Sequence, residues 1–360
     1  MLSRIAKLAA RAYHPGTSAD ALEYATASDG WRLALHRYLP RGADGRGGSR
    51  RLPVVLCHGL GANHYGFDLA PEVSLARRLA SLGYDVFAVE LRGHGDSDPA
   101  SLWGERRWGF SFDDYLRLDV PAIIDRVREL ADAPAVHWVG HSMGGILLYA
   151  YLATTGGVGL ASGVAIGSSL DYSASPSGFH GTLRLRPVGR FVPAVPLGEL
   201  VRLTTPLSGR LGTSLERFNF WPSNVDGAVV RALHASTFHT ISTPVLLQLA
   251  TAFEPGGLRS WDGSVRYLER LRAAAPTVPV LALAGDKDEQ CPPGATEATL
   301  SALPAGTARA LQFGPAQGHR SHYGHFDLVI GRHAAQDVWP SLESFLASLS
   351  RGVTLPLATH

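Results

Sequence analysis

One serine in the sequence stands in a setting that can make its hydroxyl reactive. Ser142 lies between Gly140 and Gly144 in the stretch VGHSMGG, which has the spacing G-x-S-x-G. The apolar run 135–139 before it predicts a buried strand, and residues 146–153 repeat apolar side chains at helical spacing. A sharp strand-to-helix turn leaves no room for side chains beside the serine, and glycines remove that conflict. Glycine makes up 40 of the 360 residues, so the bare pattern also arises by chance and only this context gives it weight.

A base and an acid are needed to make that hydroxyl a nucleophile. The base takes the serine proton, and the acid holds the base in the correct tautomer. In a parallel sheet, such groups belong on loops at the carboxyl ends of strands. The strand that begins at residue 278 runs into Asp286 and Asp288. The loop after the last predicted strand, 307–313, carries three histidines: His319, His322 and His325.

Apolar strands and amphipathic helices alternate along most of the chain. A hairpin is predicted around the turn 28–30, and further strands are predicted over 52–59, 84–91, 135–139 and 161–169. Helices are predicted over 69–82, 112–130, 146–153, 293–303 and 334–349. Continuous apolar strands that alternate with helices indicate an α/β protein whose mostly parallel sheet is covered on both faces.

The alternation stops between residues 170 and 277. This stretch is rich in proline and carries scattered aromatic side chains, with short helical patterns between the prolines. It is too long to be a bare loop, so we interpret it as an inserted, mainly helical cap. The predicted organisation is an N-terminal helical segment, a first core part, the cap, a second core part and a tail: 1–20, 21–169, 170–277, 278–350 and 351–360.

Four stretches together resemble the α/β-hydrolase family. They are CHGLG at 57–61, LRGHGDSD at 91–98, GHSMGG at 140–145, and AGDKDEQCPP at 284–293 followed by YGHFDLVIG at 323–331. The resemblance covers the chain from about residue 22 onward. It implies the α/β-hydrolase fold, with a cap inserted into the core. Within the family, the chain is similar to the acid-lipase and polyester-synthase-like branch.

The resemblance assigns three catalytic positions. Ser142 is the expected nucleophile, His325 the general base, and Asp288 the acid, because the family places this acid three residues after the glycine at 285. Asp286 remains the rival acid. The other two histidines of the loop, 319 and 322, are expected to be solvated, and no metal site is predicted there because matching carboxylates are missing from that segment.

The same resemblance assigns the groups that stabilise negative charge on the substrate. The backbone N–H groups of Leu60 and Met143 are expected to form the oxyanion hole, and losing one such donor typically costs about a hundredfold to a thousandfold in rate. His58 and Gly59 are expected to support the loop before Leu60. His141, beside the nucleophile, is expected to pack and form hydrogen bonds rather than to take part in catalysis.

The predicted activity is hydrolysis of a lipophilic small-molecule ester through an acyl-enzyme, without a cofactor. Phe220 and Trp221 in the cap are candidates for the substrate pocket, and ordinary packing inside the cap is the alternative. Two other functions remain open at this point. One is an acyltransferase that uses the same three residues, and the other is a ligand-binding protein with residual activity.

Composition excludes several other classes of protein. Hydrophobic residues make up 45% and charged residues 18% of the chain, which is enough to bury a large core. The net charge of +2 gives no general reason to expect nucleic-acid binding. Neither Cys57 nor Cys291 has a CxxC partner, so no disulfide or metal framework is indicated, and Cys291 has no predicted role.

The first fifteen residues predict an amphipathic helix. Leu2, Ile5 and Leu8 fall on one face and basic residues on another. The apolar run is too broken for a signal peptide or a membrane span. Docking of this helix on the body of the protein is the favoured interpretation, and contact with a membrane surface is the alternative. No later stretch is apolar enough to cross a bilayer, so a cytoplasmic protein is expected; the sequence indicates no oligomeric state.

Overall fold

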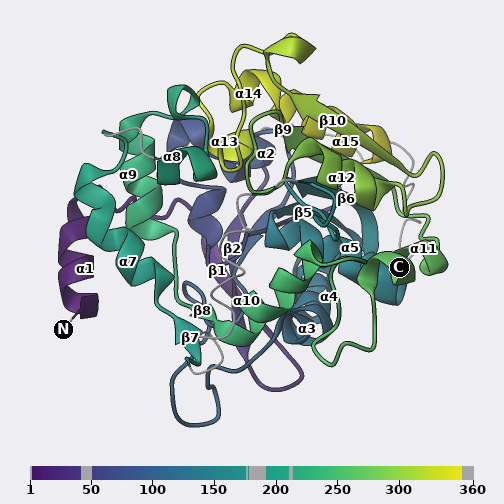
Figure 1. Ribbon diagram of the computed structural model, residues 1–360, viewed down its shortest axis with the longest axis horizontal. Helices are drawn as coiled ribbons and strands as arrows, with labels where there is room; N and C mark the ends of the chain where they lie inside the picture. The colour runs from purple at the N-terminus through teal and green to yellow at the C-terminus, as the bar shows by residue number, and fades with distance from the viewer. Residues whose placement is uncertain (1, 42–50, 176, 178–191, 211–213, 351–360) are drawn as a thin grey trace, which may run out of the picture.

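The computed structural model describes residues 2–41, 51–175, 177, 192–210 and 214–350. Its centre is an eight-stranded sheet with the order β1-β2-β4-β3-β5-β6-β9-β10 (Figure 1). Strand β2 pairs antiparallel with β1 and β4, and the other neighbours are parallel, which confirms the predicted, mostly parallel sheet. The strands are β1 Ala21–Thr26, β2 Arg32–Tyr38, β3 Val54–Cys57, β4 Val86–Val89, β5 Val136–His141, β6 Leu160–Ile166, β9 Val280–Gly285 and β10 Ala308–Phe313. The predicted tail lies outside the described residues.

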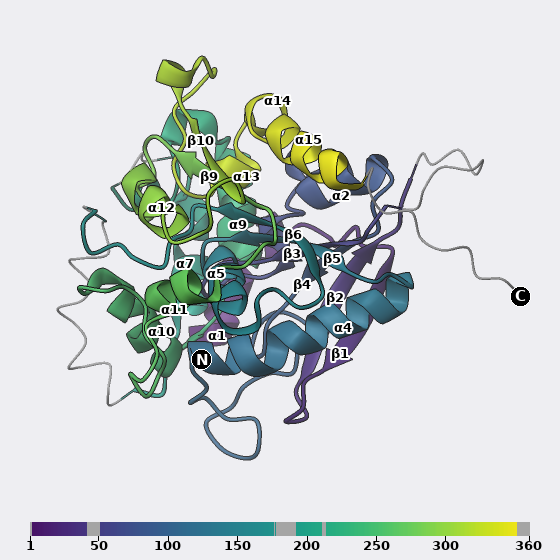
Figure 2. The ribbon, with the colours of Figure 1, turned by 90° about the vertical axis from the view of Figure 1, so that its right-hand side faces the viewer.

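Helices cover both faces of this sheet, and each face has its own apolar cluster. The helices α2 (Leu75–Ser81) and α15 (Trp339–Ser350) lie on one face, and α4 (Val120–Ala131) and α5 (Met143–Thr155) lie on the other (Figure 2). Every residue of β3 and β4 is buried, as expected for parallel strands between two helical layers. The carboxyl edge of the sheet is therefore a firmly packed platform for the loops that follow the strands.

Three predicted helices differ from those in the structure; the one over 112–130 comprises α3 (Phe112–Asp114), the π-helical stretch Tyr115–Asp119 and α4. The prediction over 69–82 is wrong in extent: a short 3₁₀ turn covers Pro71–Val73, and α2 begins only after Ser74, whose side chain accepts a hydrogen bond from the N–H of Arg77. Serine is a favoured N-cap residue, and this one starts the helix anew. The closing helix is divided into α14 (Ala334–Asp337) and α15. The remaining helices of the core are α12 Pro293–Leu300 and α13 Asp327–Ile330.

The stretch predicted to be a cap contains five described helices and a small second sheet. These elements are β7 Ala194–Val195, α7 Leu197–Thr204, α8 Ser214–Asn219, α9 Gly227–Ser236, β8 Ile241–Ser242, α10 Thr243–Leu249 and α11 Tyr267–Ala274. The helix α11 packs against α5 of the core, and its Tyr267 and Leu271 join the first apolar cluster. Residues 178–191 and 211–213, also within the predicted cap, lie outside the described residues.

The N-terminal helix α1 (Leu2–Ala10) lies against helices of the predicted cap. It contacts α7 and α9, on the left of Figure 1. Ala6 and Ala10 are buried in this contact, so the small side chains of α1 face the cap. Among the described residues, no helix combines the length and the apolar character that a membrane crossing requires.

Candidate active site

Ser142 occupies a strained turn between β5 and α5. It is the single residue between His141, which ends β5, and Met143, which begins α5, and its backbone angles are φ +53° and ψ −118°. A positive φ in a residue other than glycine costs on the order of 1–3 kcal/mol and persists only where the surroundings hold it. The N–H of Ser142 donates to the carbonyl of Ile166 at 2.8 Å, and Ser168 Oγ donates to the carbonyl of Ser142 at 2.8 Å. The turn is thus fixed to β6.

Three glycines around Ser142 are required because neighbouring atoms lie too close for a side chain. A Cβ on Gly140 would lie 2.2 Å from the carbonyl oxygen of Gly144, and a Cβ on Gly144 would lie 2.2 Å from that of Cys57. A Cβ on Gly145 would lie 2.2 Å from Ser168 Oγ. These distances are far inside van der Waals contact, so the glycine spacing that the sequence displays is a packing requirement of the turn.

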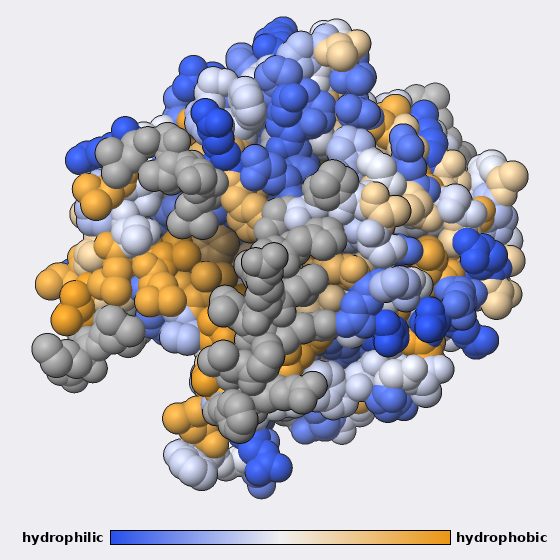
Figure 3. All heavy atoms as spheres, viewed as in Figure 1, coloured by the Kyte–Doolittle hydropathy of each residue, from blue (hydrophilic) through white to orange (hydrophobic). Residues whose placement is uncertain are grey.

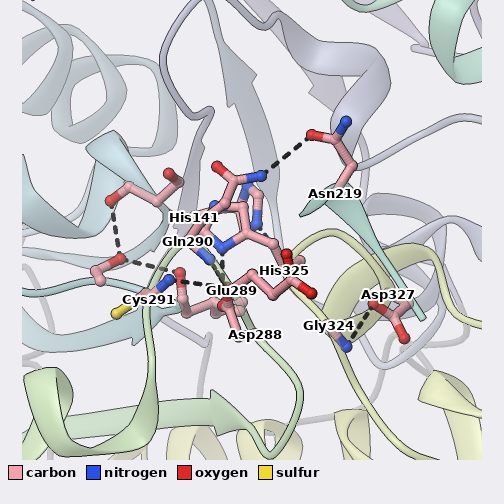
Figure 4. A network of polar contacts seen from close by, with 12 residues as sticks. His141, Asn219, Asp288, Glu289, Gln290, Cys291, Gly324, His325 and Asp327 are labelled. Carbon is pink, nitrogen blue, oxygen red and sulfur yellow. Dashed lines mark hydrogen bonds and ion pairs between the residues drawn. The ribbon is translucent and has the colours of Figure 1, made fainter. Parts of the chain in front are cut away.

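A buried aspartate and histidine form a pair near this turn. His325 Nδ1 and Asp288 Oδ2 are 2.8 Å apart, and both side chains are almost completely buried. The other carboxylate oxygen accepts the N–H groups of Gln290 at 2.9 Å and Cys291 at 2.8 Å, so Asp288 cannot rotate freely. We call residues 288–291 the acid loop and residues 322–327 the histidine loop; both are seen in Figure 4. The Cys291 backbone, left without a role by the sequence, helps to hold the acid.

Glycine at 167 lets the pair approach the turn of Ser142 closely. The N–H of Ser142 donates to the carbonyl of Ile166, and Gly167 is the next residue. A Cβ on Gly167 would lie 3.0 Å from both Asp288 Oδ2 and His325 Nδ1. On the opposite side, a Cβ on Gly59 would lie 3.0 Å from the Cβ of Ser142. The need for glycine at 167 was not recognised in the sequence, although the stretch IGSS after β6 contains it.

The rival acid, Asp286, has a different partner. Its Oδ2 contacts Nδ1 of His322, and its Oδ1 accepts the N–H of Tyr323 at 2.9 Å. Thus the structure brings Asp288, and not Asp286, to His325. It also shows that His322, expected to be solvated, contacts Asp286 and is half-buried. His319 bonds within its own turn at Gly314.

Comparison with known proteins places this architecture in a described fold. Residues 53–192 match the family described as alpha/beta hydrolase fold. A solved carboxylesterase of Nitrososphaera gargenis covers 92% of this chain and 100% of its own with a TM-score of 0.57 and 19% identity. An esterase from Rhodococcus sp. covers 91% and 99%, with a TM-score of 0.57 and 21% identity. The chain has the α/β-hydrolase fold.

Relatives of similar sequence are named as lipases. Lipase 1 of Drosophila melanogaster is 35% identical over 130 residues, which are 34% of this chain and 27% of the relative. Human gastric triacylglycerol lipase is 35% identical over 128 residues, or 32% of this chain and 30% of the relative. The chain thus matches less than a third of the length of either curated relative.

The loop predicted to form part of the oxyanion hole follows β3 and is held by a neutral histidine. His58 Nδ1 lies 2.8 Å from the carbonyl oxygen of Gly59, and its Nε2 accepts the N–H of Leu91 at 3.2 Å. Burial lowers the pKa of His58 to about 3, so the ring is neutral and its Nδ1 carries the proton. Gly59 lies beside Ser142, and the next residue is Leu60. Met143 opens α5, where the first N–H groups of a helix have no partner within the helix.

His141 contacts the backbone of the histidine loop. Its Nε2 lies 3.2 Å from the carbonyl oxygen of His325, and the two rings are 4.7 Å apart between centroids. Burial lowers the pKa of His141 well below its usual range, so it stays neutral and donates a hydrogen bond without adding charge next to His325. This hydrogen bond is made to the backbone of His325, and it helps to hold the histidine loop in position.

The two aromatic residues proposed for the pocket have different surroundings. Phe220 is 1% exposed, lies in the second apolar cluster and touches the histidine loop at Gly324. Trp221 is half-buried and stands edge-on to the His322 ring, with 4.9 Å between centroids. Contact of either side chain with a substrate stays a prediction, and the surroundings of Phe220 are those of a core residue.

One further group of side chains has the residue types of a metal site. His36, His64 and Glu90 are buried, and each offers one atom that could ligate a metal. These atoms lie within 4.8 Å of one another. However, the two imidazoles stack face to face, with centroids 3.5 Å apart and planes at 19°, so their in-plane lone pairs run side by side. Glu90 already accepts His64 Nδ1 at 2.6 Å and the N–H of Asp96 at 2.5 Å. We interpret the group as a hydrogen-bond cluster that joins β2, β4 and the loop after β3.

Proposed function

We propose that the chain is a serine ester hydrolase in which Ser142, His325 and Asp288 form the catalytic triad. The observation that carries this proposal is the buried Asp288–His325 hydrogen bond beside the strained serine turn. With Nδ1 directed at the carboxylate, His325 has its Nε2 as the free, basic nitrogen. That nitrogen is buried and has no hydrogen-bond partner among the residues that the structure describes.

We propose the following reaction for these groups. His325 Nε2 takes the proton of the Ser142 hydroxyl as Oγ bonds to the ester carbonyl carbon. The N–H groups of Leu60 and Met143 would stabilise the oxyanion that forms. When the tetrahedral intermediate collapses, the C–O bond to the alcohol breaks and the alcohol leaves with the proton from His325. Water, deprotonated by the same nitrogen, then attacks the acyl-enzyme, and Ser142 recovers its proton.

A lipophilic ester is the substrate class that we propose. On one side of the molecule, Figure 3 shows apolar residues gathered over α1 and α7. Ile5 and Leu8 of α1, Leu200 of α7 and the nearby Leu207 are exposed, Leu8 by 73%. Apolar groups that gather on a surface often mark contact with a lipid phase or an apolar partner. The lipase names of the curated relatives support the same class.

Hydrolysis of short, soluble esters tests the activity separately from the substrate class. We expect acetate ester hydrolysis without added metal, undiminished by a chelator, and lost in Ser142→Ala. Turnover that a chelator abolishes and zinc restores would contradict the mechanism. For the substrate class, Leu8→Ser with Leu200→Ser should slow the hydrolysis of an emulsified long-chain ester but not of the acetate. Leu102→Ser, which changes a 59%-exposed leucine outside these helices, is the matched control.

A further inference from the structure

A short piece of the cap touches both loops that carry the proposed acid and base. We call residues 218–224 the latch segment. The side-chain amide of Gln290, in the acid loop, donates to the carbonyl of Phe218 and to Oδ1 of Asn219, both at 3.1 Å. The N–H of Phe326, in the histidine loop, donates to the carbonyl of Asn219 at 2.8 Å. The contact of Gln290 with Asn219 is seen in Figure 4.

Asp327 ties the histidine loop to the same segment. Its Oδ1 accepts the N–H of Gly324 at 2.8 Å, within the loop, and the N–H of Trp221 at 3.3 Å. Its Oδ2 accepts the side-chain amide of Asn224 at 3.0 Å. The carboxylate is completely buried, and these contacts all come from donors. Trp221 and Asn224 belong to the latch segment, so one carboxylate bridges the cap and the loop of the proposed base. Figure 4 shows the contact of Asp327 with Gly324.

The latch segment and the histidine loop are in close contact. A Cβ on Gly324 would lie 2.8 Å from the Cα of Phe220. Asn224 is itself completely buried, and its amide also donates to the carbonyl of His322 at 3.3 Å. The carbonyl of Asn224 accepts the N–H of Arg332 at 2.6 Å, which anchors the latch segment beyond α13. A shift of the latch segment would therefore move the backbone on both sides of His325.

We propose that Asp327 is a positioning residue that, through Trp221 and Asn224, makes the placement of His325 depend on docking of the latch segment. The inference rests on the proposed function, in which His325 is the base. A misplacement of about 1 Å in a catalytic group can cost roughly a hundredfold in rate. The cap is then part of the frame that assembles the triad, in addition to any role as a wall of the pocket.

Two variants separate the cap contact from the loop's own contacts. Asp327→Asn keeps the shape of the side chain but replaces one acceptor oxygen by an NH2 group. That group then faces one of the N–H donors that surround the carboxylate in the wild type. Asn224→Ala removes the cap side of the bridge and leaves the Asp327–Gly324 hydrogen bond in place. The measurement is the single-turnover rate of Ser142 acylation by a soluble acetate ester, too small to fill an apolar pocket. We expect both variants to slow acylation by about tenfold to a hundredfold. The ester concentration that gives half of the maximal acylation rate should change little.

Asp68→Asn is the control for loss of stability alone. Asp68 is a buried carboxylate that bonds Ser18, Tyr38 and Ser74, none of which lies in the acid loop, the histidine loop or the latch segment. It should lower the melting temperature without slowing acylation. Acylation of Asn224→Ala at the wild-type rate would overturn the inference, as would slowing that merely follows the melting temperature in all variants. A wild-type protein that is not acylated at Ser142 would instead overturn the proposed function itself, and this inference with it.

Discussion

Two carboxylate–imidazole pairs join the loop after β9 to the histidine loop, and they differ in burial. Asp286 with His322 and Asp288 with His325 both use Nδ1 of the ring. The His322 side chain is 36% exposed, whereas that of His325 is 2% exposed and its other nitrogen is buried without a described partner. The same two residue types therefore serve differently: the outer pair closes a loop, and the inner pair lies beside the serine turn. Burial of His325 beside the proposed nucleophile, more than its pairing with an aspartate, distinguishes the proposed base from His322.

Neutralising each aspartate in turn gives the largest expected difference between the two pairs. Asp288→Asn should lower kcat by about ten-thousandfold, because the amide no longer holds the productive tautomer of His325. Asp286→Asn should lower kcat by no more than about tenfold. It should instead destabilise the protein by roughly 1–3 kcal/mol, because the N–H of Tyr323 loses its charged acceptor.

Steady-state kinetics on an acetate ester and urea unfolding of both variants check this contrast. Circular dichroism shows whether each variant is folded. The reverse order of kcat losses would move the acid to Asp286 and break the comparison.

Phe220 and Trp221 allow a similar comparison between neighbouring residues of the latch segment. Phe220→Ala should destabilise the protein by about 3–5 kcal/mol and slow all esters alike, because a buried ring leaves a cavity. Trp221→Ala should change the preference among acyl chains if the indole lines the pocket, since each buried methylene contributes about 0.8 kcal/mol. Values of kcat/KM on acetate, butyrate and octanoate esters, measured beside the melting temperature, check both. Equal losses on all three esters in Trp221→Ala would remove Trp221 from the pocket.

The last comparison concerns the pH dependence of stability. Burial raises the pKa of Asp327 to about 7, although hydrogen bonds from Asn224 and the backbone oppose that rise. The folded protein thus binds this proton more tightly than the unfolded chain, whose aspartate titrates near 4. Its contribution to stability is present below about pH 4 and is lost as the pH rises to about 7, with a slope of at most about 1.4 kcal/mol per pH unit.

Urea unfolding of the wild type and of Asp327→Asn at pH 5 and pH 8 measures this slope. The wild type should lose stability relative to the variant between the two pH values. Parallel behaviour of the two proteins would show that the carboxyl group does not titrate in this window.

The sequence predicts local features of this fold better than contacts made across space. The alternating strands and helices identify the sheet, and the glycines around Ser142 follow from the crowding of one turn. The spacing after Gly285 distinguishes Asp288 from Asp286 only through a family resemblance. The sequence does not predict the contacts of the latch segment, because they join residues about 70 and 100 positions apart. Asp327 stands in the quoted stretch YGHFD, yet nothing in the sequence shows that its partners are in the cap.

The most direct measurement is covalent labelling by an ester-like phosphonate, with the labelled peptide located by mass spectrometry. We expect one label per chain, on Ser142, formed rapidly in the wild type and in Asp286→Asn and far more slowly in His325→Gln and Asp288→Asn. Such a pattern requires both the nucleophile and the inner pair. A label on another residue, or labelling of Ser142 at the same rate without His325, would contradict the proposed triad.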